Sequence, residues 1–130
     1  MIKRYANVIG EVAGGGTPCY FSSFTNQTSG ASYYQEDATI TGAAGALVTL
    51  QVTGYDTDNS TPTFYINSQI RVLNGIVYVT LDGTGHVTIP LRVEGNAAET
   101  GTYIYGIVTI VGVSSGSPSG LVSRTVSKIF

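Results

Sequence analysis

The chain of 130 residues has very little from which a metal site, a cofactor site or a disulfide could be built. It contains one cysteine, Cys19, one histidine, His86, and no tryptophan. A single cysteine excludes an intrachain disulfide and the zinc sites that use cysteine pairs. We therefore expect no cofactor and no structural metal, because a domain of this length can be held by its hydrophobic core alone.

Charge is also scarce. Charged residues make up 11% of the chain and the net charge is −2, whereas an average domain has about 25% charged residues. The few basic residues are dispersed, while nucleic-acid-binding proteins concentrate Lys and Arg on one face. No apolar run approaches the roughly 18 residues of a membrane helix. We therefore expect neither a nucleic-acid partner nor a membrane partner.

The N-terminus does not match an export signal well. Residues 1–4 (MIKR) have the charge of a signal-peptide n-region, but residues 5–16 contain Asn7 and Glu11 and end in glycines, which is too short and polar for an h-region. We expect no signal peptide. The composition, rich in Thr, Ser, Gly, Tyr and Asn, is nonetheless typical of extracellular proteins. A virion protein, made in the host cytoplasm, combines both features, so the virion is the predicted location.

Strand-forming residues dominate the rest of the chain. Val, Ile and Thr are frequent, and these β-branched side chains suit a pleated, half-buried surface. Alternating segments bounded by turn residues are predicted as strands at 19–24, 38–41, 46–54, 63–72, 76–81, 86–93, 102–113 and 121–130. No amphipathic helix is predicted. The pattern favours an all-β fold, an immunoglobulin-like β-sandwich of about seven strands, with a jelly roll as the alternative.

The glycine run at 14–16 divides the chain into two parts. Residues 1–17 are predicted to be an extended N-terminal arm, because a short β-capable piece at 2–9 precedes the glycines. Residues 18–130 form the predicted single domain, since Pro18 suits a strand boundary. Inside it, residues 25–32 are expected to be a polar loop. Asn74-Gly75 predicts a type I′ hairpin, and residues 82–85 (DGTG) predict a second hairpin turn.

Two segments near the C-terminus have unusual patterns. Residues 102–113 are nearly all apolar, which predicts a strand buried on both faces or covered by a partner. In the last strand, Arg124 and Lys128 share a face with Val122, Val126 and Phe130. Such a mixture favours an edge strand, or a strand docked on a neighbouring molecule.

Catalytic constellations are missing from the sequence, so we expect no enzyme. His86 follows a turn glycine and is interpreted as a solvated turn histidine. Residues 116–120 (GSPSG) have proline where a nucleophile elbow needs serine. Cys19 is interpreted as a small buried hydrophobe. Glu36 and Asp37 are adjacent, so on a strand they would point to opposite faces, and both are interpreted as solvated loop charges.

A calcium site at Asp56 and Asp58 is an open alternative. The spacing resembles the start of an EF-hand loop, but Thr61 and Asn67 stand where that loop needs Gly and Glu. A looser site of loop carboxylates competes with a turn closed by Asx hydrogen bonds.

Several tyrosines and amides invite a glycan-binding interpretation, because sugar rings stack on flat aromatic side chains beside amides. The competing interpretation is that these tyrosines belong to a protein interface. The candidate glycan or interface contacts are Tyr33, Tyr34, Tyr55, Tyr65, Asn67 and Gln69.

Four short stretches between residues 38 and 116 form a recognisable order: residues 39–42 (TITG), 48–50 (VTL), 81–89 (LDGTGHVTI) and 101–103 (GTY). This pattern of turns and alternation resembles the immunoglobulin-like modules of tailed-phage virion proteins and bacterial surface proteins. The resemblance implies a sandwich in which Tyr103 is a tyrosine-corner residue. The tryptophan and cysteine pair of antibody domains are absent.

These observations together predict a structural virion protein of a tailed phage, such as a capsid decoration or auxiliary protein that binds neighbouring subunits. Its partners would be other virion proteins and further copies of the chain. Docking is expected through Ile2 and Tyr5 of the arm and through Ile129 and Phe130 at the C-terminus. The alternative function is that of a carbohydrate-binding module or a cell-surface adhesion domain, with a glycan as the partner.

Overall fold

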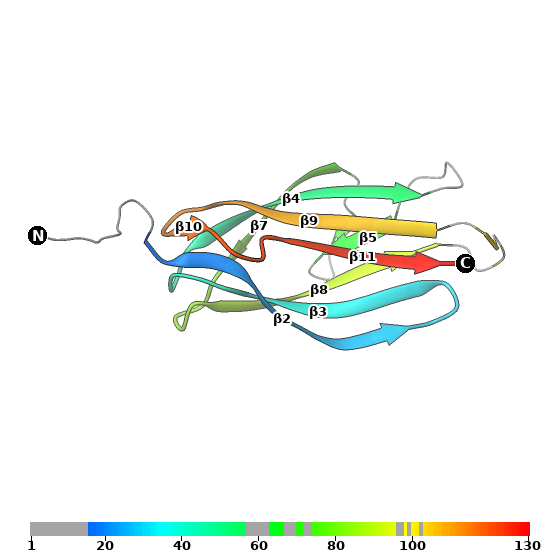
Figure 1. Cartoon of the computed structure of the whole chain (residues 1–130), viewed down its shortest axis with the longest axis horizontal. Coiled ribbons are helices and arrows are strands. Elements are labelled where there is room, and N and C mark those ends of the chain that lie inside the picture. The colour runs from blue at the N-terminus through cyan, green and yellow to red at the C-terminus, as the bar shows by residue number, and fades with distance from the viewer. Residues whose placement is uncertain are drawn as a thin grey trace, which may run out of the picture.

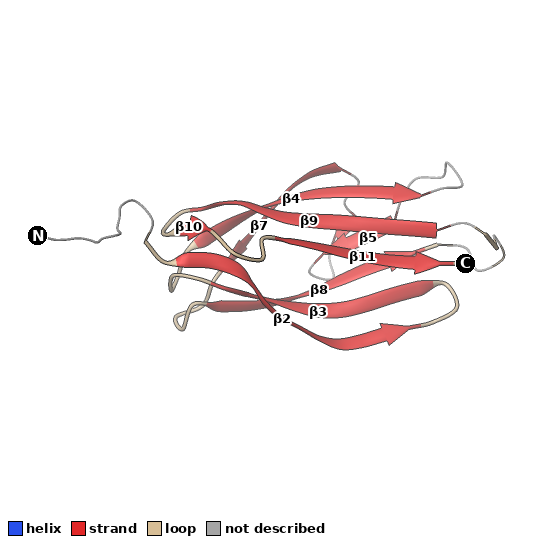
Figure 2. Cartoon of the chain, in the orientation of Figure 1, coloured by secondary structure: helices blue, strands red, loops and turns tan. Residues whose placement is uncertain are grey.

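The computed structural model describes residues 16–56, 63–66, 70–71, 74–95, 98, 100–101 and 103–130. These residues form strands, turns and loops (Figure 2). No helix occurs among them, and hence none that is long and apolar enough to cross a membrane. The all-β prediction is therefore confirmed for the described part of the chain.

The strands form two sheets, with strand orders β10-β2-β3-β8-β5-β6 and β11-β9-β4-β7 (Figure 1). The six-stranded sheet consists of β2 (Pro18–Ser29), β3 (Tyr33–Thr41), β5 (Thr63–Ile66), β6 (Ile70–Arg71), β8 (His86–Glu94) and β10 (Ser117–Pro118). The four-stranded sheet consists of β4 (Leu47–Asp56), β7 (Asn74–Thr80), β9 (Tyr103–Val113) and β11 (Ser123–Ile129). Neighbouring strands are antiparallel, except that β10 runs parallel to β2.

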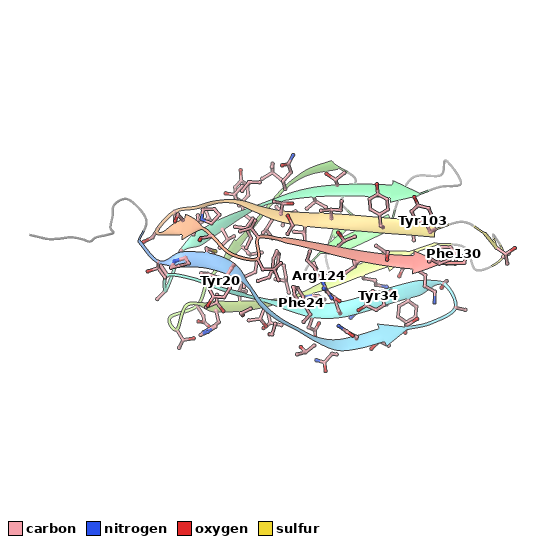
Figure 3. All side chains as sticks on the ribbon, viewed as in Figure 1. Tyr20, Phe24, Tyr34, Tyr103, Arg124 and Phe130 are labelled. Atoms are coloured by element: carbon pink, nitrogen blue, oxygen red, sulfur yellow. The ribbon has the colours of Figure 1, made fainter. Side chains whose placement is uncertain are left out.

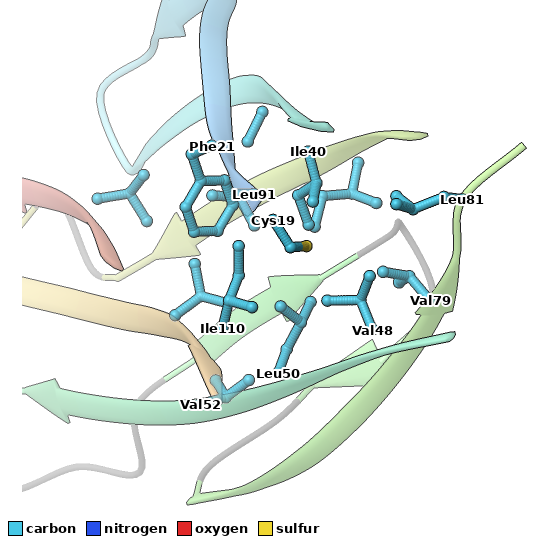
Figure 4. Packing of buried hydrophobic residues seen from close by; sticks show 14 of the residues in the cluster. Cys19, Phe21, Ile40, Val48, Leu50, Val52, Val79, Leu81, Leu91 and Ile110 are labelled. Atoms are coloured by element: carbon cyan, nitrogen blue, oxygen red, sulfur yellow. The ribbon is translucent and has the colours of Figure 1, made fainter. Parts of the chain in front are cut away.

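The hydrophobic core lies between the two sheets. Phe21, Ile40 and Leu91 face it from the six-stranded sheet, and Leu50 and Ile110 face it from the four-stranded sheet (Figure 4). Each fully buried side chain of this kind contributes roughly 1.5–3 kcal/mol. The alternation of apolar and polar residues along each strand thus specifies which face turns inward.

The first hairpin is longer than predicted. Residues 25–29 continue β2 instead of starting a loop, so the prediction of a polar loop over 25–32 is wrong for most of its length. Two register shifts against β3 accommodate the extension. Asn26 adopts a φ of 53° and its amide donates a 2.8 Å hydrogen bond to Asp37. Polar side chains therefore form part of the strand pairing here.

The predicted hairpin at Asn74-Gly75 is wrong. Both residues begin β7 and pair with Thr53 and Val52 of β4. The predicted strand 63–72 is instead divided into β5 and β6, which pair with each other in the opposite sheet. The chain therefore changes sheets before Asn74, because β6 belongs to the six-stranded sheet and β7 pairs with β4 in the other.

The turn at 82–85 exists, but it connects β7 and β8, which belong to different sheets. The Asp82 carboxylate accepts hydrogen bonds from the Thr84 amide (2.8 Å), the Thr84 hydroxyl (2.7 Å) and the His86 amide (3.1 Å). These bonds, led by that of the hydroxyl, lower the pKa of Asp82. Gly85 has a φ of +83°, and a Cβ there would overlap with the Gly42 carbonyl oxygen. His86 is exposed, as predicted.

Within the nearly apolar segment 102–113, residues 103–113 form β9, inside the four-stranded sheet. Ile104, Val108 and Ile110 are buried in the core, while the alternate residues face away from it. Burial on both faces therefore does not occur among the described residues. β11 lies at the edge of the sheet, as predicted, and Cys19 is fully buried, as predicted.

Candidate functional site

The outer face of the four-stranded sheet carries no charged residue among its described side chains. We call it the uncharged face. Its members alternate along the four strands with the residues that face the core. The described members are Leu47, Thr49, Gln51, Thr53, Ile76, Tyr78, Thr80, Tyr103, Tyr105, Ile107, Thr109, Val111, Ser123, Thr125, Ser127 and Ile129.

Exposed large apolar side chains gather on this face. With the exception of Leu121, every exposed large apolar residue of the described chain belongs to it: Leu47, Ile76, Tyr78, Tyr103, Val111 and Ile129. The two most exposed are Ile129, at 77%, and Tyr78, at 62%. Scattered exposed apolar residues are normal on a protein surface, but their concentration on one face marks an interaction site.

A shallow hollow of about 440 Å³ lies on the uncharged face over β9 and β11. It is lined by Tyr103, Tyr105, Ile107, Thr125, Ser127 and Ile129. The rings of Tyr103 and Tyr105 stack with their centroids 6.0 Å apart and their planes at 16°, because residues two apart on a strand point to the same side. Tyr103, at the start of β9, can be located in Figure 3. The hollow offers flat aromatic surface beside hydroxyl groups and no charge.

The outer face of the six-stranded sheet is different. The Arg92 guanidinium lies 4.0 Å from the centre of the Tyr33 ring, donates a 3.0 Å hydrogen bond to Gln35 and forms an ion pair with Glu94. Arg92 and Glu94 therefore satisfy each other's charge, and they give this face the polar character of a solvated surface.

A third cluster lies between the sheets. Glu36 of β3 is fully buried, and its carboxylate accepts hydrogen bonds from Arg124 Nε (2.6 Å), Arg124 Nη2 (2.7 Å) and the Tyr34 hydroxyl (2.7 Å). The Arg124 guanidinium also lies 3.8 Å from the centre of the Phe24 ring, and Figure 3 places Arg124 between the ribbons of β11 and β3. Burial, with help from Glu36, raises the pKa of Tyr34 to about 12, and the bonds to Glu36 raise the pKa of Arg124.

The interpretation of Glu36 as a solvated loop charge is therefore wrong. Glu36 and Asp37 do point to opposite faces, as predicted, but both lie in β3 rather than in a loop. The sequence signal for the buried partner was present in Arg124. A cation on the inward face of a strand favours a carboxylate partner there, since unpaired charges are rarely buried.

The structure distributes the described members of the predicted glycan set over both sheets. Tyr33 and Tyr34 are adjacent on β3 and point to opposite faces, one toward Arg92 and one toward Glu36. Tyr55 lies in β4, in the other sheet, opposite Tyr105 in the register. Tyr65 lies in β5, opposite Arg92. The predicted contacts Asn67 and Gln69 lie outside the described residues.

The predicted docking residues are described only at the C-terminus. Ile129 lines the hollow of the uncharged face. Phe130 is half-buried instead, because its ring packs against the core and against Gly95. Ile2 and Tyr5, with the rest of residues 1–15, lie outside the described residues.

Chemistry of other kinds has little basis in the described part of the chain. No group of three or more His, Cys, Asp or Glu side chains there is arranged to hold a metal ion. Asp56 ends β4, and Asp58 lies outside the described residues. Burial raises the pKa of the Cys19 thiol, which disfavours the reactive thiolate. The uncharged face is therefore the strongest candidate for a functional surface.

Comparison with known proteins adds no relative. No family model matches the chain, and neither a curated protein nor a solved structure matches it.

Proposed function

We propose that this chain is a structural protein that binds other protein subunits, and that its work is binding rather than catalysis. The uncharged face carries the proposal. A sheet face left to water normally has polar and charged residues at alternate positions, whereas this one has tyrosines, aliphatic residues and hydroxyls. Depletion of charge together with enrichment in aromatic residues is characteristic of the core of protein interfaces.

The physical reason lies in desolvation. A buried charge has to be paired or it costs several kcal/mol, while Thr and Ser hydroxyls are far cheaper to bury. On this face the Thr109 and Ser123 hydroxyls already bond each other at 2.9 Å. A partner that covers the face therefore gains apolar contact with Ile129, Tyr78 and their neighbours without having to match a charge.

We propose further that the two sheets form an immunoglobulin-like sandwich. Strands β2, β3, β8 and β5 in one sheet, and β11, β9, β4 and β7 in the other, occupy the positions A-B-E-D and G-F-C-C′ of that architecture. One departure is that β7 follows β5 and β6 along the chain. Tyr103, which the resemblance assigns to a tyrosine corner, starts β9 with its ring stacked on Tyr105.

The setting that we propose is the virion of a tailed phage, where the chain would be a capsid decoration or auxiliary protein. Low charge, abundant hydroxylic residues and the pattern of residues 81–89 and 101–103 support this setting. Mass spectrometry of purified virions from a phage that encodes the chain should detect it in stoichiometric amounts. Its absence from particles of a lysate in which it is abundantly expressed would contradict the setting.

The docking surface is tested by placing a charge on it. Thr125→Lys puts a lysine beside the hollow, and Thr88→Lys is the matched control, since Thr88 is an exposed threonine on the outer face of the other sheet. Sedimentation of the purified chain with virions should show weaker association for Thr125→Lys by at least about tenfold. If both variants associate as strongly as the wild type does, docking through the uncharged face is contradicted.

A second candidate function is glycan binding at the hollow. The stacked pair Tyr103 and Tyr105 beside Thr125 and Ser127 favours it, because pyranose rings stack on tyrosines and hydroxyls complete the contact. A glycan array should then show binding that Tyr103→Ala abolishes and Tyr33→Ala leaves intact. An array without binding at millimolar glycan concentration excludes this function.

A further inference from the structure

The edges of the two sheets differ in how well they resist pairing with another strand. Among the described residues, β6 and β10 have two residues each, and β10 contains Pro118. The rest of β2, which does not pair with β10, has two register shifts against β3. β11 turns Arg124 and Lys128 inward. Short strands, prolines, bulges and inward charges are the usual protections of a sheet edge.

β7 has none of these protections. It has seven residues, Asn74–Thr80, none of them charged and none of them proline. One side pairs with β4 along the whole strand, and no other described strand lies against its second side. Ile76 and Tyr78 are 49% and 62% exposed. A regular, uncharged edge of this kind is a template for another strand, because a row of its N–H and C=O groups points outward.

We propose that two copies of the chain join by antiparallel pairing of their β7 strands. One sheet then runs through both copies, and their uncharged faces become continuous. This inference rests on the proposed function, because it identifies the first partner of the same surface as a second copy of the chain.

The absence of charge is the reason for choosing a second copy. In a pair related by a two-fold axis, each residue near the axis lies beside its own counterpart or a close neighbour, so any charge there repels itself. Neither β7 nor the outward residues of the adjacent β4, from Leu47 to Thr53, carry a charge. The same pairing through β11 would bring the Arg124 and Lys128 side chains of both copies close together.

Sedimentation equilibrium of the full chain tests the pairing. The wild type should be a dimer, and Tyr78→Lys should raise the dimer dissociation constant by at least about tenfold, because it places two lysines at the junction. Thr88→Lys is the matched control, since Thr88 is an exposed strand position outside the uncharged face. It should leave the dimer intact. Circular dichroism and urea unfolding verify that both variants fold.

Cross-linking tests the geometry directly. The double variant Ile76→Cys with Tyr78→Cys covers three registers of an antiparallel β7 pair. In each of these registers, a cysteine of one copy lies directly opposite a cysteine of the other copy. Mild oxidation should then link the copies, since directly opposed strand residues meet the distance requirement of a disulfide. The control variant Thr125→Cys with Ser127→Cys on β11 should stay unlinked. The amides of residues 74–80 should exchange with solvent more slowly in the dimer than in Tyr78→Lys.

The outcomes separate this inference from the proposed function. A chain that stays monomeric at all concentrations overturns the inference, and so does a dimer that survives Tyr78→Lys with freely exchanging β7 amides. If Thr125→Lys nevertheless weakens that dimer or its association with virions, docking through the uncharged face stands without β7 pairing. If neither lysine variant changes any association, both proposals fail.

Discussion

Arg124 of β11 holds the buried carboxylate of Glu36 in β3 with two hydrogen bonds, of 2.6 and 2.7 Å. The pair links the two sheets, because β3 and β11 belong to different ones. Phe24 covers the guanidinium from the β2 side. A bidentate pair of this geometry is among the stronger polar contacts in proteins, but both groups lost water when the sheets came together.

Removing one partner should be far more costly than removing both. In Arg124→Leu the carboxylate of Glu36 stays buried without its cation, and we expect a loss of about 3 kcal/mol in the free energy of unfolding. This value is at the low end of the usual range because the Arg124 side chain is 29% exposed. Urea unfolding at about pH 7 measures the change.

The outer-face ion pair supplies the control. Arg92→Leu breaks the contact with Glu94, where both side chains are about a third exposed, and should cost only about 1 kcal/mol. The double variant Glu36→Leu with Arg124→Leu should lie within about 1 kcal/mol of the wild type, because well-packed apolar residues can replace a buried pair. Equal losses for Arg124→Leu and Arg92→Leu would show that burial of Glu36 is not decisive.

Strand positions were predictable from the sequence wherever the signal is local. Alternation placed the core face of the segments that became β4 and β8, because a period of two residues needs no knowledge of neighbours. The sheet to which each strand belongs was not predictable. Asn74-Gly75 has the residues of a tight hairpin, but both residues pair with β4, whereas β6 before them belongs to the other sheet.

The candidate site was predictable only in part. The sequence singled out residues 102–113 as a strand with too much apolar surface, and alternate residues from 103 to 111 belong to the uncharged face. β4, β7 and β11 extend the same face through long-range strand pairing, which the local sequence pattern does not encode. For the same reason the tyrosines chosen from the sequence, such as Tyr33 and Tyr55, lie on different sheets.

Tyr34 should titrate late in alkaline solution. Its pKa of about 12 reflects burial first and the carboxylate of Glu36 second. The folded state thus favours the neutral phenol. That contribution to stability is complete below the ordinary tyrosine pKa of 10.0 and is lost as the pH rises toward 12. Ultraviolet titration should show a phase near pH 12 that Tyr34→Phe removes and that Tyr78→Phe, at an exposed position, retains. A late phase that survives Tyr34→Phe would refute the assignment.

Gly85 should be much less tolerant of a side chain than Gly83, two residues earlier in the same turn. Gly85 has a φ of +83° and its added Cβ would overlap with the Gly42 carbonyl oxygen, while nothing lies within 4 Å of a Cβ at Gly83. Gly85→Ala should therefore destabilise by at least about 2 kcal/mol, and Gly83→Ala by less than about 0.5 kcal/mol. Thermal unfolding compares the two variants directly. Similar melting temperatures for both would mean that the turn relaxes around the added methyl group at little cost.

The carboxylate of Asp82 should make the turn between β7 and β8 sensitive to acid. Its pKa is lowered chiefly by the hydrogen bond from the Thr84 hydroxyl, and then by the amides of His86 and Thr84. A depressed pKa means that the stabilisation is present above the ordinary value of 3.8 and is lost as the pH falls through the lower folded-state value. Carbon-detected NMR titration should place the Asp82 carboxyl below its usual range, and Thr84→Val should move it part of the way back, since two backbone donors remain. Asp82→Asn should remove this part of the acid sensitivity in urea unfolding. An Asp82 carboxyl that titrates at the same pH in the wild type and in Thr84→Val would show that the hydroxyl does not hold the charged form.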